Sequence, residues 1–425
     1  MNLKIQAQKI TNNSHLKLTG SKSETNRLLL LQALFSDITL ENTSISDDSE
    51  VMAAAIKINA DGLQKNEIDI HHAGTAMRFL TAYFAQKEGS EVVLTGSTRM
   101  QERPISILVD ALKQLGADIE YVNNFGFPPV SIWGKKLIKN KVSLPANVSS
   151  QYISALLLIA PKLENGLELT LIGEITSVPY IKMTLALLNE IGVETQFDNN
   201  KIVVKPHSTD EFLSKIEQKI IIESDWSSAS YFYSIIALSP IGTSITLSSF
   251  KQNSLQADSV LADIYVNFGV ETSFKSGNIT ISKNRIHPTD FFSKGLDCSN
   301  CPDIAQTIAV TAFGLGLPCH LTGLHTLKIK ETDRLEALKT ELTKLGAKIS
   351  ITNNSLTLEI NQKQNLKAFG QSSIATYQDH RMAMAFAPLG LISEIQIENA
   401  QVVSKSFPTY WEDLRSIGFR VEEVC

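Results

Sequence analysis

An internal repeat constrains the fold of this 425-residue chain more than any other feature of its sequence. Short polar segments with small residues recur before apolar stretches of helical character, and glycines that follow amphipathic stretches recur in step with them. The polar segments begin at residues 21, 74, 149, 225, 303 and 380, and the glycines are Gly116, Gly192, Gly269, Gly346 and Gly418. After a shorter first interval, both markers return every 72 to 78 residues. Two independent markers with one period indicate a repeated supersecondary unit.

Each repeat is expected to hold a helix, a strand, a second helix, a strand and a further strand or two. A glycine just past a helix supplies the left-handed residue that a C-cap favours, and the Val, Ile and Thr residues behind it favour strands. Only seven residues follow Gly418 whereas 20 precede Ser21, so the N-terminal segment is expected to complete the sixth repeat. We therefore predict two domains of three repeats, residues 21–222 and residues 1–20 with 223–425. The two short crossings predict a hinge that opens and closes a cleft.

Composition argues against several classes of protein. The chain is 43% hydrophobic and 20% charged, which is typical of a folded globular protein rather than a disordered one. Its formal net charge of −5 argues against a general binder of nucleic acid or acidic membranes, so an anion site must come from a local group of Lys and Arg residues. No apolar run approaches the roughly 18–20 residues that a membrane span needs. We expect no leader, no membrane segment and a cytoplasmic protein.

The first polar segment has the residues of an anion site. It reads Gly20-Ser21-Lys22-Ser23-Glu24-Thr25-Asn26-Arg27 and is followed by four leucines. Free backbone N–H groups, the positive end of a helix dipole and two cationic side chains would favour the same anion. The alternative is that a serine merely caps the helix while Lys22 and Arg27 remain in solvent. Cations recur near the other predicted helix starts, which favours an anion site in a net acidic protein; these cations are Arg78, Arg99, Arg103, Lys330, Arg334, Arg381 and Lys405.

Three residues are candidates for proton transfer. Asp303 and Glu331 lie in segments that the repeat directs to the cleft, and a carboxylate among cations stays ionised and can accept a proton from a hydroxyl. Asp303 alone could instead be a helix N-cap. His380 either titrates near neutrality or is a hydrogen-bonded structural imidazole. Lys330 and Arg334 are expected to be i,i+4 neighbours on a helical turn, where an anion or Glu331 must compensate their repulsion.

The sequence lacks the motifs of several common catalytic and nucleotide-binding sites. There is no Walker loop, no Gly-x-Gly-x-x-Gly after a strand and no Gly-x-Ser-x-Gly elbow, and no covalent nucleophile stands out. Cys298-x-x-Cys301 with Cys319-His320 could mimic a zinc site, but a single Cys pair is a weak signal. We expect no metal, and thiols that stay reduced.

Nine motifs occur in an order and at positions that resemble one known family over nearly the whole chain. They are Gly20-Ser21-Lys22-Ser23 with Asn26-Arg27, Ala73-Gly74-Thr75-Ala76-Met77-Arg78, Arg99-Met100-Gln101-Glu102-Arg103-Pro104-Ile105, Ser149-Ser150-Gln151, Ser177 with Pro179-Tyr180, Pro302-Asp303, Lys330-Glu331-Thr332-Asp333-Arg334, Asp379-His380-Arg381-Met382-Ala383-Met384 and Lys405-Ser406-Phe407-Pro408. On these motifs the chain is similar to the 5-enolpyruvylshikimate-3-phosphate (EPSP) synthases.

The resemblance implies both a fold and an activity. The implied fold is the enolpyruvyl transferase fold, an α/β architecture of two inside-out α/β barrel domains, each with three repeats of a helix-strand unit and parallel buried helices. The implied activity is transfer of the enolpyruvyl group of phosphoenolpyruvate to the 5-hydroxyl of shikimate 3-phosphate, with release of phosphate, in aromatic amino-acid biosynthesis. The reaction implied is an addition and elimination through a tetrahedral intermediate.

The same resemblance implies roles for individual residues. Those implied to bind shikimate 3-phosphate are Lys22, Ser23, Arg27, Ser149, Ser150, Gln151, Ser177, Tyr180, Asp303 and Lys330. Those implied to bind phosphoenolpyruvate are Lys22, Gly74, Arg99, Gln151, Arg334, Arg381 and Lys405. The implied catalytic residues are Asp303, Glu331, Lys22 and His380. The resemblance implies no metal or organic cofactor and no nucleic-acid or membrane partner, and we expect a monomer.

The chain departs from the family pattern at two positions. His72 stands where the family often has Asn, and Thr326 stands where some members have an Asn that contacts the shikimate ring. One alternative is a UDP-N-acetylglucosamine enolpyruvyl transferase, which pairs its N-terminal Lys with Asn and usually carries a loop Cys; here Ser23 replaces that Asn and no Cys precedes Cys298. A second is a non-catalytic anion-binding paralogue, which would be expected to have lost a catalytic residue. By the resemblance Gly74 stands at the family's inhibitor-contacting position and keeps the site open there, so we expect glyphosate to compete with phosphoenolpyruvate.

Overall fold

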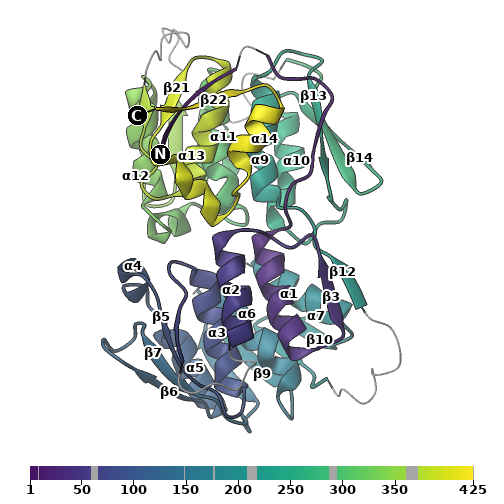
Figure 1. Cartoon of the computed structure of the whole chain (residues 1–425), viewed down its shortest axis with the longest axis vertical. Coiled ribbons are helices and arrows are strands. Elements are labelled where there is room, and N and C mark those ends of the chain that lie inside the picture. Colours follow the sequence, from purple (N-terminus) through teal and green to yellow (C-terminus); the bar gives the residue numbers. More distant parts are fainter. Residues whose placement is uncertain are drawn as a thin grey trace. The chain divides into compact units, whose positions relative to one another are not determined.

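The chain divides into two compact units. The computed structural model describes residues 1–7, 9–58, 66–147, 149–175, 178–207, 218–286, 294–359 and 372–424. Gly20–Ile222 form one unit, called the central unit below, and Met1–Thr19 with Glu223–Cys425 form the other, called the terminal unit. Figure 1 shows α1, α3 and α6 in the central unit and α9, α11 and α13 in the terminal unit.

Each unit contains three sheets among the described residues, and five of the six sheets share one pattern. In that pattern a parallel pair of strands is followed by two antiparallel pairs. Two of the five sheets belong to the central unit and have the strand orders β4 (Asn66–Asp69), β5 (Glu91–Thr95), β7 (Val130–Trp133), β6 (Asp118–Tyr121) and β8 (Lys141–Pro145), β9 (Leu167–Ile172), β11 (Lys201–Val204), β10 (Thr195–Asp198). Two sheets of the terminal unit have the orders β2 (Ser14–Leu16), β13 (Ser244–Ser248), β15 (Asn278–Lys283), β14 (Val270–Lys275) and β16 (Leu296–Asp297), β17 (Cys319–Thr322), β19 (Leu356–Glu359), β18 (Lys348–Ile351). The third sheet of the terminal unit has the order β20 (Ser373–Ile374), β21 (Ile395–Ile397), β1 (Asn2–Gln6), β22 (Arg420–Val424).

The shortened first repeat has a smaller sheet. It is the parallel pair of β12 (Gln218–Ile221) and β3 (Ile38–Glu41), both in the central unit. Each strand that comes just before a crossing stays in its own unit, because β12 pairs with β3 and β2 pairs with β13. The chain therefore crosses between units after β2 and again after β12.

The N-terminal strand completes the sheet of the last repeat. β1 lies between β21 and β22 and is antiparallel to both; Leu3 faces Ile397 on one side and Glu423 on the other. Along β1 the side chains alternate, and those of Leu3 and Ile5 point into the core. Of the segment before the first helix, β1 thus joins the sheet of the last repeat, whereas β2 joins the sheet of β13.

One helix of each repeat is buried on nearly all sides. These helices are α1 (Lys22–Leu34), α3 (Gly74–Gln86), α6 (Ser150–Ile159), α9 (Trp226–Leu238), α11 (Ala305–Gly314) and α13 (His380–Phe386). In α11 all ten residues are buried, seven of them are apolar and none is charged, which is the pattern of an interior rather than a surface helix. No helix within the described residues is long and apolar enough to cross a membrane.

The other α-helices of the described residues each have exposed side chains on one face. They are α2 (Asp47–Ile58), α4 (Thr98–Gln101), α5 (Ser106–Leu115), α7 (Val178–Glu190), α10 (Leu261–Val266), α12 (Arg334–Lys344) and α14 (Tyr410–Ser416). In α5, for example, Leu108, Leu112 and Leu115 are buried on one face while Lys113 and Gln114 on the other face are exposed.

Hydroxyl groups join the buried helices at equivalent positions of successive repeats. Ser230 and Thr307 share a hydrogen bond of 3.1 Å, and Thr311 donates to Ser234 at 2.8 Å. Both pairs are 77 residues apart, and the second lies four residues beyond the first on both helices. Because equivalent residues meet at two successive turns, α9 and α11 run parallel and in register.

The glycine marker ends helices as predicted. Gly116 follows α5 with φ of 106°, and its N–H bonds to the carbonyl groups of Leu112 and Lys113. The equivalent glycines Gly192, Gly269, Gly346 and Gly418 also have positive φ. These left-handed residues stop one helix in each of five repeats and direct the chain into the following strand.

Replacing Ile5 by Ala tests the role of β1. Ile5 has no exposed surface, so the truncation should lower the free energy of unfolding by about 2–5 kcal/mol through lost burial and a cavity. Urea unfolding measures the loss, and hydrogen exchange should show weaker protection in β21 and β22. Gln6→Ala, at an exposed position on the same strand, is the control. Equal stability of the two variants would contradict the placement of β1.

Candidate active site

Arg27 is a buried cation of the central unit. Its Nε donates to Thr184 Oγ1 at 2.8 Å, Nη1 to the Ser23 carbonyl at 2.9 Å and Nη2 to Ser154 Oγ at 3.0 Å. Its guanidinium carbon lies 5.9 Å from the centre of the Tyr180 ring. Burial lowers the pKa of Arg27 to about 10. Its hydrogen-bond acceptors among the described residues are neutral, and the charge of the nearby Glu24 offsets the effect of burial only in part.

Lys22 is the first residue of α1 and forms an ion pair with Asp48 at 3.3 Å. Asp48 belongs to the first turn of α2 and is 4% exposed. Ser21 stands at the N-cap position of α1, but its side chain makes no capping hydrogen bond. The reading in which this serine simply caps the helix while Lys22 stays in solvent therefore does not hold.

The starts of α3 and α6 meet through Gln151. Its Nε2 donates to Thr75 Oγ1 at 2.9 Å, and the two residues are 76 positions apart, so they are equivalent in successive repeats. Ser149 is the N-cap of α6, and its Oγ accepts the Gln151 N–H at 3.4 Å. Ser150 follows and is buried. Ser177 lies outside the described residues.

Two arginines surround Gly74, the first residue of α3. Arg78 Nη1 donates to the Gly74 carbonyl at 2.9 Å, and a Cβ atom added at Gly74 would lie only 2.7 Å from Arg103 Nη1. Burial, and then the charge of Arg103, lower the pKa of Arg78 to about 10. Arg99 differs: its side chain is 63% exposed and pairs with Glu102 at 2.9 Å. The structure thus brings Arg78 and Arg103 to Gly74 and turns Arg99 away to solvent.

Arg334 joins three carboxylates in the terminal unit. Its Nε donates to Asp379 at 2.6 Å, Nη1 to Asp303 at 2.9 Å and Nη2 to Glu331 at 2.7 Å. The Arg334 side chain is 2% exposed. Burial alone would lower the pKa of Arg334, but the three carboxylates outweigh it, and the net pKa lies above its usual range. The guanidinium therefore stays charged and fixes three acidic residues from separate segments.

Asp303 is surrounded by cations. Its Oδ1 lies 2.9 Å from Arg334 and 3.7 Å from Lys330, and its Oδ2 lies 3.2 Å from Arg381 Nη2. Burial favours the neutral acid, but Arg381, Lys330 and Arg334 together hold the pKa of Asp303 below its usual range. The N-cap of α11 is Ile304, so Asp303 is not capping that helix. The side chain is 14% exposed, and the surrounding cations favour its ionised form.

The expected i,i+4 arrangement of Lys330 and Arg334 is wrong. Lys330 ends the short helix η6 (His325–Ile329), whereas Arg334 begins α12. Asp333 interrupts the turn because its carboxylate accepts the backbone N–H groups of Leu335 and Glu336, at 3.1 and 3.2 Å, as the N-cap of a new helix. The two cations meet at Asp303 instead, which compensates both.

Glu331 and His380 lie on either side of this cluster. Glu331 bonds to Arg334 through one oxygen, and its other oxygen lies 3.0 Å from Lys405 Nζ. His380 is the first residue of α13 and is 2% exposed, with Nδ1 3.7 Å from Asp379 Oδ1. Asp379 caps α13 by accepting the Arg381 N–H at 2.9 Å. One carboxylate thus orients the helix start that carries both His380 and Arg381.

An unusual turn precedes Asp379. Tyr377 and Gln378 have φ of 53° and 58°, in the left-handed region that side chains with a Cβ disfavour. Tyr377 Oη donates to Glu341 Oε1 at 2.6 Å, and both Glu341 oxygens lie 2.8 Å from Lys344 Nζ. Glu341 is fully buried on α12. The bonds to Glu341 hold the turn in this conformation and so place the start of α13.

Sequence reasoning missed four carboxylate or hydroxyl groups that contact the candidate residues. They are Asp48 beside Lys22, Asp379 beside Arg334, Ser227 beside Arg381 and, behind the Ser227 hydroxyl, Asp258. Asp379 stands within a quoted motif and could have been found there. Asp48 and Asp258 carry no local signal, because their partners are distant in sequence.

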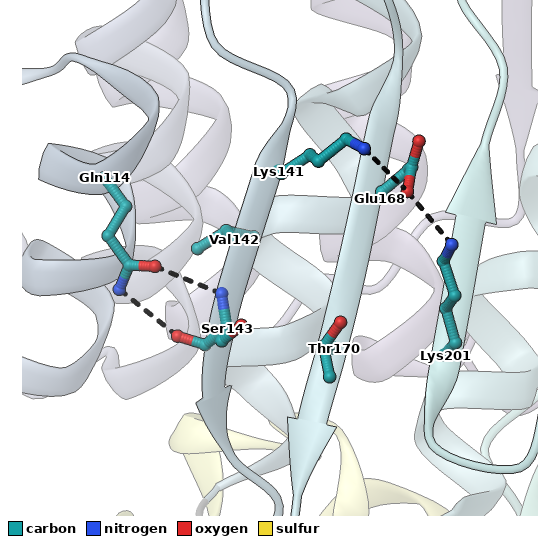
Figure 2. A pocket seen from close by; sticks show the side chains of 7 residues that line it. All are labelled: Gln114, Lys141, Val142, Ser143, Glu168, Thr170 and Lys201. Atoms are coloured by element: carbon teal, nitrogen blue, oxygen red, sulfur yellow. Dashed lines mark hydrogen bonds and ion pairs between the residues drawn. The ribbon is translucent and has the colours of Figure 1, made fainter.

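A hollow of about 290 Å³ lies away from these residues, on the sheet of β8, β9 and β11 (Figure 2). Gln114 exchanges hydrogen bonds of 3.1 and 3.2 Å with the Ser143 backbone, and Glu168 pairs with Lys141 and Lys201. The polar groups that line it thus bond to one another, and none of the candidate residues contributes to it.

Comparison with known proteins shows the family of the chain. A family model for EPSP synthase (3-phosphoshikimate 1-carboxyvinyltransferase) matches residues 7–414. The chain belongs to the EPSP synthase family. It is 45% identical over 413 residues to a 3-phosphoshikimate 1-carboxyvinyltransferase of Bacteroides fragilis strain YCH46, with 96% of each chain covered. It is 36% identical over 428 residues to that of Haemophilus influenzae strain Rd, with 95% of this chain and 96% of the relative covered.

Solved structures show the same fold. An EPSP synthase from Acinetobacter baumannii aligns with a TM-score of 0.76 over 99% of this chain and 100% of its own, at 21% identity. The enolpyruvyl transferase NikO from Streptomyces tendae aligns with a TM-score of 0.71 over 100% and 98%, at 12% identity. The fold is the inside-out α/β barrel of the enolpyruvyl transferases, with three helix-strand repeats in each domain. The predicted family and fold are confirmed.

Replacing Asp379 by Asn tests the Arg334 network. The variant removes one of three charges that compensate a buried guanidinium, and the free energy of unfolding should fall by as much as about 3–5 kcal/mol. Urea unfolding at neutral pH measures the change. Glu336→Gln, at an exposed position on α12, is the control and should remain within about 0.5 kcal/mol of the parent. Equal midpoints for both variants would contradict the importance of this network.

Proposed function

We propose that Asp303 is the proton acceptor of the reaction that this chain catalyses as an EPSP synthase. The chain is a 3-phosphoshikimate 1-carboxyvinyltransferase: it transfers the enolpyruvyl group of phosphoenolpyruvate to shikimate 3-phosphate in aromatic amino-acid biosynthesis. The observation that carries the proposed role is the set of three cations, Arg334, Lys330 and Arg381, around one ionised carboxylate. Such a group keeps Asp303 deprotonated at neutral pH and ready for a hydroxyl proton.

The buried cations of the central unit support a site for shikimate 3-phosphate. Arg27, with neutral partners, and the start of α6 offer a positive charge, hydroxyl groups and backbone N–H groups to an anion. We propose that this substrate is held by Lys22, Ser23, Arg27, Ser149, Ser150, Gln151, Ser177, Tyr180, Asp303 and Lys330.

Phosphoenolpyruvate carries a phosphate and a carboxylate, so its site needs several cations. We propose that it is held by Lys22, Gly74, Arg99, Gln151, Arg334, Arg381 and Lys405. Arg99 must then leave Glu102, its exposed partner, when the substrate binds. An exposed ion pair of this kind contributes little, so the exchange costs little free energy.

The proposed chemistry is an addition followed by an elimination. The 5-hydroxyl oxygen bonds to the central enol carbon as its proton passes to Asp303, and the methylene carbon gains a proton to become a methyl group. The tetrahedral intermediate then loses phosphate as the C–O bond breaks and the methyl group returns a proton. Asp303 and Glu331 relay the protons, Lys22 stabilises developing negative charge, and His380 supports the site from the start of α13. The steps need no metal or organic cofactor.

The division of the candidate residues between the two units has a consequence for how the enzyme works. We propose that the units close around the substrates, because residues of both are needed to neutralise two anions and to exclude water. We also propose that the enzyme acts in the cytoplasm, which the free thiols of Cys298, Cys301 and Cys319 support, and that it acts as a monomer.

Release of phosphate from phosphoenolpyruvate tests the function directly. It should require shikimate 3-phosphate, and release without that second substrate would contradict the assignment.

Asp303→Asn should lower kcat by at least about 10²-fold, as expected for loss of a general base, while both substrates still bind. Asp297→Asn, an exposed carboxylate nearby, should retain activity. Parental kcat in Asp303→Asn would rule out the proposed base.

Gly74→Ala tests the phosphoenolpyruvate site and the proposed competition by glyphosate. The added Cβ would stand 2.7 Å from Arg103 Nη1 and 2.9 Å from Arg78 Nη1, so both guanidinium groups must shift. We expect the KM for phosphoenolpyruvate to rise about tenfold, the loss of one charged hydrogen bond, and inhibition by glyphosate to weaken. Steady-state kinetics with varied phosphoenolpyruvate measure both. Unchanged constants for both compounds would place their site elsewhere.

A further inference from the structure

Asp258 is a buried carboxylate behind the candidate site of the terminal unit. It lies in the short helix η3 (Ala257–Val260) and is 6% exposed. Its Oδ2 accepts the hydroxyl proton of Ser227, the second residue of α9. Ser227 Oγ in turn accepts from Arg381 Nη2 at 3.3 Å. A buried acid thus reaches Arg381 through one hydroxyl group.

One Arg381 nitrogen contacts Asp303 directly and is linked to Asp258 through Ser227. Nη2 lies 3.2 Å from Asp303 Oδ2 and 3.3 Å from Ser227 Oγ, while Nη1 donates to the Asp303 carbonyl at 3.2 Å. Three acceptors therefore fix the plane of the guanidinium group. Two of them belong to Asp303, and the third is held in place by Asp258.

The segment that carries Asp258 is fastened to the start of α9. Gln256 Oε1 accepts the backbone N–H of Trp226 at 2.9 Å, and Gln256 Nε2 donates to the Ser224 carbonyl at 2.9 Å. Gln256 is buried. Asp258 and Ser227 are therefore parts of one rigid piece, and their hydrogen bond is set by packing rather than by chance orientation.

We propose that Asp258 is a positioning residue for enolpyruvyl transfer: through Ser227 it fixes the guanidinium of Arg381 and so directs that charge toward phosphoenolpyruvate and Asp303. The inference rests on the proposed roles of Arg381 and Asp303. An ionised carboxylate can only accept hydrogen bonds, so the Ser227 hydroxyl must donate to Asp258 when Asp258 is ionised. The lone pairs of the serine oxygen then face Arg381. A neutral carboxyl can donate a proton instead, which removes this constraint.

The surroundings of Asp258 place its proton loss in the neutral range. Burial, and then the negative charge of Asp303, raise the pKa of Asp258 to about 7. Arg381 and the Ser227 hydrogen bond act in the opposite direction, and Asp225, the N-cap of α9, raises it further. The buried thiol of Cys301 also lies within reach of its charge. Because the ionised form is the one that fixes Arg381, kcat/KM for phosphoenolpyruvate should rise with pH through about 7.

The first test compares Asp258→Asn with Asp263→Asn, an exposed carboxylate on the following helix, in the full-length enzyme. For Asp258→Asn we expect the KM for phosphoenolpyruvate to rise about tenfold and that for shikimate 3-phosphate to stay within about twofold. The rise of kcat/KM near pH 7 should also disappear, while Asp263→Asn keeps it. An unchanged KM for phosphoenolpyruvate together with the parental pH profile would overturn the proposal.

Ser227 offers a second test that is independent of how well Asp258→Asn folds. Ser227→Ala should raise the KM for phosphoenolpyruvate as Asp258→Asn does, and Ser227→Thr, which keeps the hydroxyl group, should restore it. Equal KM values for the Ala and Thr variants would overturn the proposal.

Arg381→Lys distinguishes a failure of the proposed role of Arg381 from a failure of the proposed role of Asp258. If it leaves the KM for phosphoenolpyruvate unchanged, the proposed function of Arg381 is wrong; if it raises the KM while Asp258→Asn and Ser227→Ala do not, only the role of Asp258 is wrong.

Discussion

Burial of one helix per repeat on nearly all sides is the constraint on which the structure depends. A polar group inside such a helix has little water to bond, so it bonds to a carbonyl group of its own helix, as Thr81 does, or to a partner on another buried helix. The repeat solves this by letting equivalent residues meet, as Ser234 and Thr311 do in the terminal unit and Thr75 and Gln151 do in the central unit. Parallel helices in register follow from these contacts. The helix starts, where backbone N–H groups are free, therefore gather at one end of each unit and form the polar end at which the candidate residues lie.

The buried arginines of the two units have different hydrogen-bond partners. In the central unit Arg27 and Arg78 hydrogen-bond to hydroxyl and carbonyl oxygens, and burial lowers the pKa of both. In the terminal unit Arg334 and Arg381 bond to carboxylates, which raise their pKa above the usual range despite burial. The first arrangement is suited to binding an anion, since a substrate can supply the missing negative charge. The second is suited to keeping a base ionised, since its cations are already in place.

The sequence predicted the repeated unit and the glycines that cap its helices. The period, the capping glycines and the return of the N-terminal segment to the last sheet follow from local propensities that are spaced evenly along the chain, and each can be checked residue by residue. The details of the site depend on contacts between distant segments, which propensity does not report. Asp333 changed the relation of Lys330 to Arg334 by starting a new helix, and Asp258 reached the site only through Ser227. The left-handed turn at Tyr377 was also unpredictable, because neither Tyr nor Gln favours that conformation and a buried Glu341 enforces it.

The place of β1 between β21 and β22 also governs the order in which the protein takes shape during synthesis. The central unit has all of its strands once residue 222 has left the ribosome, so it can fold while the rest of the chain is still being made. The terminal unit cannot close its last sheet until β22 exists, because β1 needs a neighbour on each side. Both neighbours of β1 lie far from it in the sequence, so this pairing closes a long loop and is expected to be a late step in the folding of the terminal unit.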